Sequence, residues 1–256
     1  MIELIGLITG CGLLLLIYML REAFKNKVKY HELCFEDYPQ SARPLNVFFI
    51  SDVHRRKIDR TIISEVEGKT DFVVIGGDLT EKGVPFSRTR DNIAMLKELG
   101  PVYFIWGNND YEVEEQPFRS LLESCGVIII ENSSLLLEGN DDHPVALIGV
   151  EDLSLRRDDV EGAFSKVPEK SFRILLAHNP DTIKKLSKKH NVSLMLSGHT
   201  HGGQIRIFGF GMYQKGKVTN IAGTDVLVSN GYGTTALPLR LGAPPETHLI
   251  TIKGKY

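Results

Sequence analysis

Phe48-Phe49-Ile50-Ser51-Asp52-Val53-His54 is a short apolar run that leads directly into two potential metal ligands. Four later apolar runs, 72–75, 103–106, 174–177 and 194–197, lead to Asp78, to Asn108, to His178, and to His199 with His201. A short, almost wholly apolar run predicts a strand that is buried on both faces. Because ligands bind beyond the carboxyl ends of the strands in open α/β sheets, we expect these seven side chains to converge. The sequence therefore predicts a metal site.

The length and charge of the chain restrict the classes of protein to consider. Its 256 residues suffice for one full-sized domain with an ordinary core. The formal net charge of −2 argues against nucleic acid as a partner, because nucleic-acid-binding domains usually carry a strongly basic face. The three cysteines, Cys11, Cys34 and Cys125, are too few and too scattered to predict a disulfide framework or a zinc knuckle.

The amino-terminal segment differs in composition from the rest of the chain. Leu4 to Leu20 is a run of 17 residues without a charged side chain, and ~17–25 such residues span a bilayer. A signal peptide, a membrane anchor and a buried helix all share this pattern. A signal peptide needs a positive start and a small-residue cleavage site, which this segment lacks, and buried helices are seldom so uniformly apolar. We therefore predict an uncleaved transmembrane helix over residues 1–21.

The residues after this helix predict its orientation. The basic flank consists of Arg21, Lys25, Lys27 and Lys29. Because positive charge collects on the cytoplasmic side of a membrane, we expect a single-pass protein of the cell membrane with its main domain in the cytoplasm. The same cations can pair with anionic lipid headgroups. Residues 22–44 are predicted to form a basic tether and lead-in to a domain over residues 45–256.

Helical patterns separate the strand-like runs. Helices are predicted over 61–67, over 87–99, from Pro117 to Gly126, and over 182–189 with Asp181 as N-cap. Further strands are predicted at 127–130, 146–150, 226–229 and 248–252, and Asn140-Asp141-Asp142 predicts a polar turn. Because strands and helices alternate early and strands predominate later, we expect an α/β domain with more than one sheet.

Seven candidate ligands are too many for one tetrahedral ion and suit two. Carboxylate and amide oxygens mixed with imidazole nitrogens favour Mn, Fe or Zn over Mg or Ca. Two ions about 3.5–4 Å apart need a bridging group, and one carboxylate can give an oxygen to each. Asp78, in the middle of the series, is the predicted bridge. One ion is assigned Asp52, His54 and His201, and the other Asn108, His178 and His199.

Each motif alone also fits a structural role, since Asp-x-His is common and Gly-Gly-Asp suits a turn. Together, the order Asp-x-His, Gly-Asp, Gly-Asn-x-Asp, His and Gly-His-x-His resembles that of the calcineurin-like metallophosphoesterases over residues 45–256. The stretches 197–205 and 231–246 resemble the membrane-associated bacterial phosphoesterases of the YkuE/YaeI type. The resemblance implies an α/β four-layer sandwich, in which two mixed β-sheets are flanked by helices, here preceded by the one transmembrane helix. It also implies a dinuclear site formed by the seven ligands.

One position departs from the family pattern. That pattern usually contains Gly-Asn-His-Asp or Gly-Asn-His-Glu, and its His assists the leaving group, whereas this chain has Asn109 there. An amide donates a hydrogen bond but does not act as an acid near neutral pH. The resemblance implies that branches without this His are phosphodiesterases. We therefore expect Asn109 to stabilise a phosphoryl oxygen without protonating the leaving group.

These observations predict a membrane-anchored, metal-dependent phosphodiesterase or pyrophosphatase in which a metal-bridging hydroxide attacks phosphorus. Two divalent ions are the expected cofactors, with Mn²⁺ first and Fe, Zn or Co as alternatives. The expected partners are the membrane and a phosphate ester, and the anchor suggests a lipid-linked one. A phosphomonoesterase and a non-catalytic metal-binding scaffold of the same fold are the alternatives. Seven converging polar groups argue against a scaffold, which has no need of them.

Overall fold

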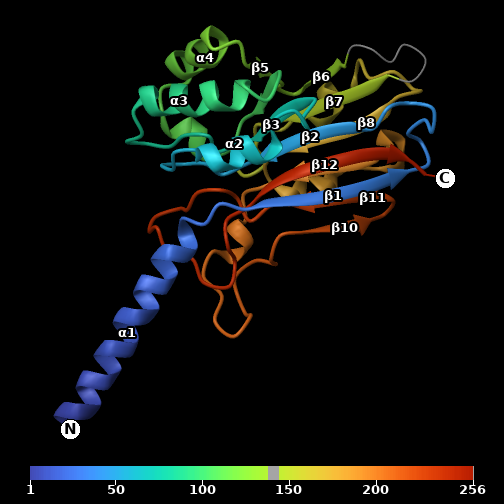
Figure 1. Cartoon of the computed structure of the whole chain (residues 1–256). Coiled ribbons are helices and arrows are strands. Elements are labelled where there is room, and N and C mark those ends of the chain that lie inside the picture. The colour runs from blue at the N-terminus through green and yellow to red at the C-terminus, as the bar shows by residue number, and fades with distance from the viewer. Residues whose placement is uncertain (138–143, 256) are drawn as a thin grey trace.

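Two six-stranded sheets form the centre of the fold in the computed structural model, which describes residues 1–137 and 144–255 (Figure 1). The first has the strand order β1-β12-β2-β3-β4-β5 and the second has the order β10-β11-β9-β8-β7-β6. The strands of the first sheet are β1 (Val28–Phe35), β2 (Leu45–Ile50), β3 (Phe72–Gly76), β4 (Val102–Ile105), β5 (Ile128–Ile129) and β12 (Thr247–Gly254). Those of the second are β6 (Ser133–Leu136), β7 (Val145–Val150), β8 (Phe172–Ala177), β9 (Leu194–Ser197), β10 (Lys217–Ile221) and β11 (Thr224–Val228).

Helices cover the outer faces of both sheets. The helices α2 (Arg60–Val66), α3 (Phe86–Lys97) and α4 (Glu115–Ser124) pack on the first sheet, and α5 (Val160–Phe164) packs on the second. Short 3-10 turns η1 (Asn109–Glu112), η2 (Pro180–Lys185), η3 (Lys188–His190) and η4 (His201–Gly203) connect the remaining elements. The buried apolar side chains form three clusters, one between the sheets and one beneath each helical layer. These clusters define the four layers that the family resemblance implied.

Strand β2 shows why the apolar runs become central strands. Phe48 and Ile50 pack under α2 and α3, whereas Val47 and Phe49 point into the space between the sheets. A strand with core on both sides needs apolar residues at every position instead of at alternate ones. Both sheets are mixed, because β12 runs antiparallel to β2, and β10 runs antiparallel to β11. The predicted fold class is therefore confirmed.

Two segments differ from the sequence-based expectation. Val28–Phe35, within the expected tether, forms β1 and pairs with β12 in parallel, from Val28 opposite Thr247 to Phe35 opposite Gly254. The helix predicted over 182–189 is wrong, because η2 and η3 occupy this region instead. The side chain of Asn179, not that of Asp181, caps η2 by accepting a hydrogen bond from the Asp181 backbone. The turn predicted at Asn140–Asp142 lies outside the described residues.

Helix α1 (Ile2–Ala23) extends away from the domain (Figure 1). It has 22 residues and is apolar enough to cross a membrane, and none of its most apolar 18-residue stretch is buried. A helix of this length is about 33 Å long, close to the roughly 30 Å hydrocarbon core of a bilayer. The absence of burial argues against the interpretation as a core helix of the domain. By length and composition α1 is therefore a candidate membrane span.

Candidate metal centre

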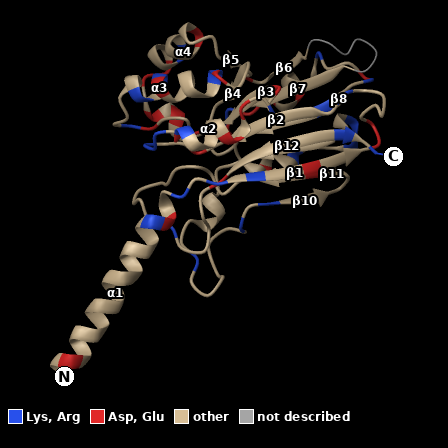
Figure 2. Ribbon diagram, in the orientation of Figure 1, with Lys and Arg blue, Asp and Glu red and all other residues tan. Residues whose placement is uncertain are grey.

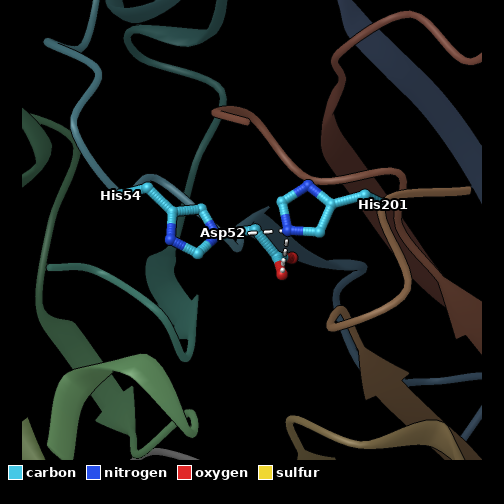
Figure 3. Close-up of side chains that lie close together, drawn as sticks. All are labelled: Asp52, His54 and His201. Atoms are coloured by element: carbon cyan, nitrogen blue, oxygen red, sulfur yellow. Dashed lines mark hydrogen bonds and ion pairs between the residues drawn. The ribbon is translucent and has the colours of Figure 1, made fainter. Parts of the chain in front are cut away.

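Three of the predicted ligands meet where β2 and β9 end. Asp52 and His54 follow β2, and His201 follows β9 as the first residue of η4. His201 Nε2 lies 3.4 Å from Asp52 Oδ1 and 3.1 Å from His54 Nε2 (Figure 3). One ligand atom from each of the three lies within 4.8 Å of the others. Two imidazoles facing one carboxylate form a donor set that fits a divalent metal ion.

Asp78, which follows β3, lies between the two predicted sets of ligands. Its Oδ2 is 3.7 Å from His54 Nε2 and 3.3 Å from His178 Nε2. Asp52, Asp78 and His178 also bring ligand atoms within 4.8 Å of one another. The carboxylate thus has one histidine of each predicted set beside it, as a bridging position requires.

The remaining predicted ligands meet on the other side of Asp78. His199 Nδ1 lies 2.9 Å from Asn108 Oδ1. His178 Nδ1 lies 2.8 Å from the carbonyl oxygen of Gly76, which can only accept, so Nδ1 carries the proton. His178 Nε2 is buried and has no hydrogen-bond partner among the described residues. This leaves Nε2 as the ring nitrogen that faces the polar site, and once it is deprotonated it is free to bind a metal.

Sequence reasoning missed Asp152 at this side of the site. Its side chain is fully buried, and its Oδ1 accepts a hydrogen bond from Leu155 N at 3.0 Å. Its Oδ2 is buried without a hydrogen-bond partner in the described part of the chain. Asp152, His178 and His199 form a further group with ligand atoms within 4.8 Å of one another. The signal was present in the sequence, because Asp152 follows the buried strand β7 just as Asp52 follows β2.

Five predicted ligands have a left-handed backbone: Asp52 (φ 53°), His54 (φ 51°), Asp78 (φ 52°), His199 (φ 70°) and His201 (φ 50°). This conformation is uncommon outside glycine, and residues held in it cluster at functional sites. Backbone hydrogen bonds between the loop after β2 and the loop after β3 stabilise this conformation. Asp52 N donates to Gly77 O and His54 N donates to Asp78 O, each at 3.0 Å.

Two glycines let the ligand loops approach one another. A Cβ atom on Gly198 would lie 2.3 Å from Asp52 Oδ2, and one on Gly107 would lie 2.3 Å from Asp78 Oδ1. No side chain fits at such distances, so both positions require glycine. The Gly-His and Gly-Asn motifs therefore contain glycine because the neighbouring carboxylates pack directly against its backbone.

Buried charged groups beyond the ligands hold the loops in place. Asp110 accepts hydrogen bonds from the backbone of Asp78 at 2.7 Å and of Gly107 at 2.9 Å. Glu81 Oε2 lies 2.9 Å from His54 Nδ1, so it orients that ring from behind. Arg240 is fully buried and donates to backbone carbonyls, including that of Ala243 at 2.8 Å. Like Asp152, Glu81 and Arg240 were not identified from the sequence.

The histidines at the site have shifted pKa values. Burial alone would lower the pKa of His178, but the adjacent Asp78 carboxylate outweighs it and raises the pKa to about 10. Burial lowers the pKa of His201 well below its usual value, and the neighbouring His54 adds to this effect. Burial and the charge of Asp78 together raise the pKa of Asp110 to about 7. Because a metal ligand must be a neutral imidazole, binding of an ion here would displace the proton that the Asp78 carboxylate stabilises on His178.

The site opens into a pocket of about 490 Å³. Its polar residues include Asp78, Asn108, Asn109, His199 and His201, and its apolar residues include Ile205, Met212, Tyr213 and Ala236. Asn109 is held by two contacts, because its backbone N donates to Asp78 Oδ1 and its Nδ2 donates to Glu112 Oε1, each at 2.8 Å. A pocket with polar groups on one side and apolar walls on the other is typical of a substrate site.

Comparisons with known proteins agree with this geometry. A model of the calcineurin-like phosphoesterase family matches residues 45–203. YpbG of Bacillus subtilis is 39% identical over 99% of this chain and 98% of its own length. Phosphodiesterase YaeI of Escherichia coli is 30% identical over 69% of this chain and 67% of its own length. A zebrafish transmembrane protein with a metallophosphoesterase domain is 32% identical over 89% of this chain and 57% of its own length. With the family match covering more than half of the chain, the protein belongs to the calcineurin-like phosphoesterases and is a metal-dependent phosphoester hydrolase.

Proposed function

We propose that this protein hydrolyses phosphodiester or pyrophosphate bonds at a centre that holds two divalent ions, with Mn²⁺ as the first choice. The observation that carries this proposal is the position of Asp78, between His54 on one side and His178 on the other. Asp52, His54 and His201 would hold one ion, and Asn108, His178 and His199 the other. When bound, the ions would activate a water molecule for attack on phosphorus and neutralise charge on the phosphoryl oxygens.

The residues of the chain prepare the site for this chemistry. Glu81 and the Gly76 carbonyl fix the ring orientations of His54 and His178, so that their Nε2 atoms face Asp78. Asn109 lines the pocket and offers an amide N–H to a phosphoryl oxygen, although in the free protein it donates to Glu112. Neutral amides stabilise developing negative charge without transferring a proton. The residues therefore favour substrates whose leaving oxygen needs no acid.

An activity assay on the full-length protein tests the proposal. We expect Mn²⁺-dependent hydrolysis of bis(p-nitrophenyl) phosphate, an aryl diester, and much slower hydrolysis of alkyl phosphate monoesters. A phosphomonoesterase would show the opposite order, and a metal-binding scaffold would hydrolyse neither. Either of these two results would refute the proposed phosphodiesterase activity.

Asp152→Asn is expected to weaken the binding of one of the two ions and to leave the binding of the other unchanged. Asp152 has a carboxylate oxygen within 4.8 Å of ligand atoms of His178 and His199, and its buried Oδ2 has no hydrogen-bond partner among the described residues. Its charge would therefore act on the ion that we assign to these histidines. Loss of a charged group that supports a metal site typically lowers metal affinity about 10–100-fold. Calorimetric titration with Mn²⁺ should show that one site keeps its wild-type affinity and that the other binds Mn²⁺ more weakly. Two unchanged affinities would show that Asp152 does not act on the metal.

We further propose that α1 anchors the protein in the cell membrane and that the catalytic domain, residues 45–256 together with β1, lies in the cytoplasm. The anchor is supported by the length and apolar surface of α1, and the zebrafish relative is named a transmembrane protein. The basic residues Arg21, Lys25, Lys27 and Lys29 follow its apolar run and support the orientation.

Protease treatment of intact protoplasts should therefore leave the catalytic domain undigested, because the membrane shields it. The domain should be digested once the protoplasts are lysed, which serves as the control. Digestion without lysis would contradict the proposed orientation.

A further inference from the structure

One wall of the pocket belongs to a loop that exposes several large apolar side chains. Residues 205–213 have the sequence Ile-Arg-Ile-Phe-Gly-Phe-Gly-Met-Tyr and are called here the apolar hairpin. Phe208, Phe210 and Met212 are 96%, 83% and 89% exposed. Leu237, whose carbonyl accepts a hydrogen bond from Gln204 just before the hairpin, is 61% exposed. Clustered apolar exposure of this kind marks a surface that contacts a membrane or another molecule.

The fold holds the apolar hairpin in a defined shape. Ile207 and Phe210 exchange both backbone hydrogen bonds, each at 2.9 Å. Phe208 and Gly209 form the turn between them with φ values of 51° and 84°. Asn-Gly is the usual sequence for such a turn, so a phenylalanine at its tip is conformationally unfavourable. Arg206 braces the loop by donating to Gly202 O at 3.0 Å and to Gly209 O at 2.6 Å.

The apolar hairpin lies next to the domain end of α1. Arg206 N donates to Leu241 O at 2.7 Å. The residue before Leu241 is Arg240, whose backbone N donates to Met19 O of α1 at 3.1 Å. In Figure 1 the apolar hairpin (orange) extends below the domain, on the side where α1 also extends from the domain. A bilayer that α1 spans therefore begins on the side toward which the apolar hairpin extends.

The charges around the apolar hairpin suit an anionic membrane surface. Residues 201–223 contain Arg206, Lys215 and Lys217 and no acidic residue. In Figure 2, α1 carries charge only near its two ends. Basic residues beside an apolar anchor attract anionic headgroups, and this charge pattern favours a lipid surface over a second copy of the chain.

We propose that the apolar hairpin inserts its tip into the boundary between headgroups and acyl chains of the bilayer that α1 spans, and that the pocket takes its phosphate ester from this bilayer. The statement that the pocket takes its phosphate ester from the bilayer rests on the proposed function. Met212 and Tyr213 line the pocket and also belong to the hairpin. An amphipathic substrate can therefore place its phosphate beside His199 and His201 while its apolar tail remains in the bilayer.

Site-specific labelling of the full-length protein tests the insertion. A Phe208→Cys variant, in a background with Cys11, Cys34 and Cys125 replaced by serine, carries an environment-sensitive fluorophore and is reconstituted into vesicles that contain phosphatidylglycerol. The matched control is Ala222→Cys at the β10–β11 turn, which has the same conformation (φ 52°, followed by Gly223 at φ 95°) and lies at the other end of the domain.

Lipids that carry a spin label on the acyl chain should quench the fluorophore at position 208 at least about threefold more than at position 222, because short-range quenching requires contact with the bilayer. Equal quenching at the two positions would overturn the insertion. Blue-shifted emission at position 208 that persists in detergent without lipid quenching would show that a second protein copy covers the hairpin, and would also overturn it.

A pair of substrates tests whether the pocket takes its phosphate ester from the bilayer. Hexadecyl p-nitrophenyl phosphate in vesicles and ethyl p-nitrophenyl phosphate in solution share one leaving group and differ in their tail. Phe208→Ser combined with Phe210→Ser should lower kcat/KM for the hexadecyl ester about tenfold, as expected for lost burial of a large apolar side chain. The ethyl ester should change less than about twofold, and the control Ile221→Ser should affect neither.

Equal losses on both esters would refute a lipid-borne substrate, while the quenching data still decide whether the hairpin inserts. A wild-type chain that hydrolyses neither ester would refute both the proposed function and the lipid-borne substrate. The insertion of the apolar hairpin would still be decided by the quenching data.

Discussion

Asp78→Ala is expected to lose both metal ions and essentially all hydrolytic activity. Asp78 lies beside a histidine of each predicted set, at 3.7 Å from His54 Nε2 and 3.3 Å from His178 Nε2. Metal ions contribute several kcal/mol to phosphoryl transfer, so the rate should fall by at least about 10³-fold. Metal content is measured by mass spectrometry on the purified protein, and activity with an aryl diester.

Asp59→Asn is the control for this experiment. Asp59 caps α2 by accepting a hydrogen bond from Thr61 N at 2.9 Å and lies outside the metal centre. This variant should keep both its ions and its activity, even if removal of the charge lowers stability slightly. If Asp78→Ala instead retained two equivalents of metal with near-normal turnover, the bridging role of Asp78 would be wrong.

The rate of hydrolysis is expected to depend strongly on the stability of the departing oxyanion. The family resemblance implies that Asn109 stands where a histidine usually assists the leaving group, and its side chain is an amide that donates to Glu112 at 2.8 Å. Acid assistance is worth about 10²–10⁴-fold, so alkyl esters should be slower than aryl esters by a clear margin. A series of diesters with leaving groups of increasing pKa measures this dependence.

Asn109→His should raise turnover of esters with poor leaving groups more than turnover of esters with good ones. Glu112 lies where it can accept from the new imidazole and hold it at the pocket. Asn109→Gln is the control, because it retains an amide and should leave the dependence on leaving group steep. A wild-type enzyme that cleaves alkyl monoesters as fast as aryl diesters would show that another residue supplies the proton.

The parts of the structure that the sequence predicted well share one physical basis. Strands β2, β3, β4, β8 and β9 have core on both faces, so their apolar runs stand out from the surrounding sequence. Polar ligand residues at the ends of such runs are equally visible. For this reason the predicted ligands could be placed at the correct ends of five strands before their distances were known.

Other features were missed because the sequence pattern carries little information about long-range pairing. Strand β1 alternates between partly buried and exposed residues next to the basic flank, and only its pairing with β12, more than 200 residues later, makes it part of the sheet. The region 180–190 has helical periodicity, but the chain forms two 3-10 turns, and Asn191 ends the second in a left-handed conformation (φ 43°). The supporting roles of Glu81 and Arg240 likewise depend on contacts between distant segments.

Stepwise addition of Mn²⁺ to metal-free full-length protein, with hydrolysis of bis(p-nitrophenyl) phosphate followed at each step, tests the central claim most directly. Three overlapping groups of ligand atoms around Asp52, Asp78, His178 and His201 predict that activity appears only as the second ion binds and that it saturates at two ions per chain. Full activity at one ion per chain, or activity that persists in the metal-free protein, would contradict a dinuclear phosphodiesterase.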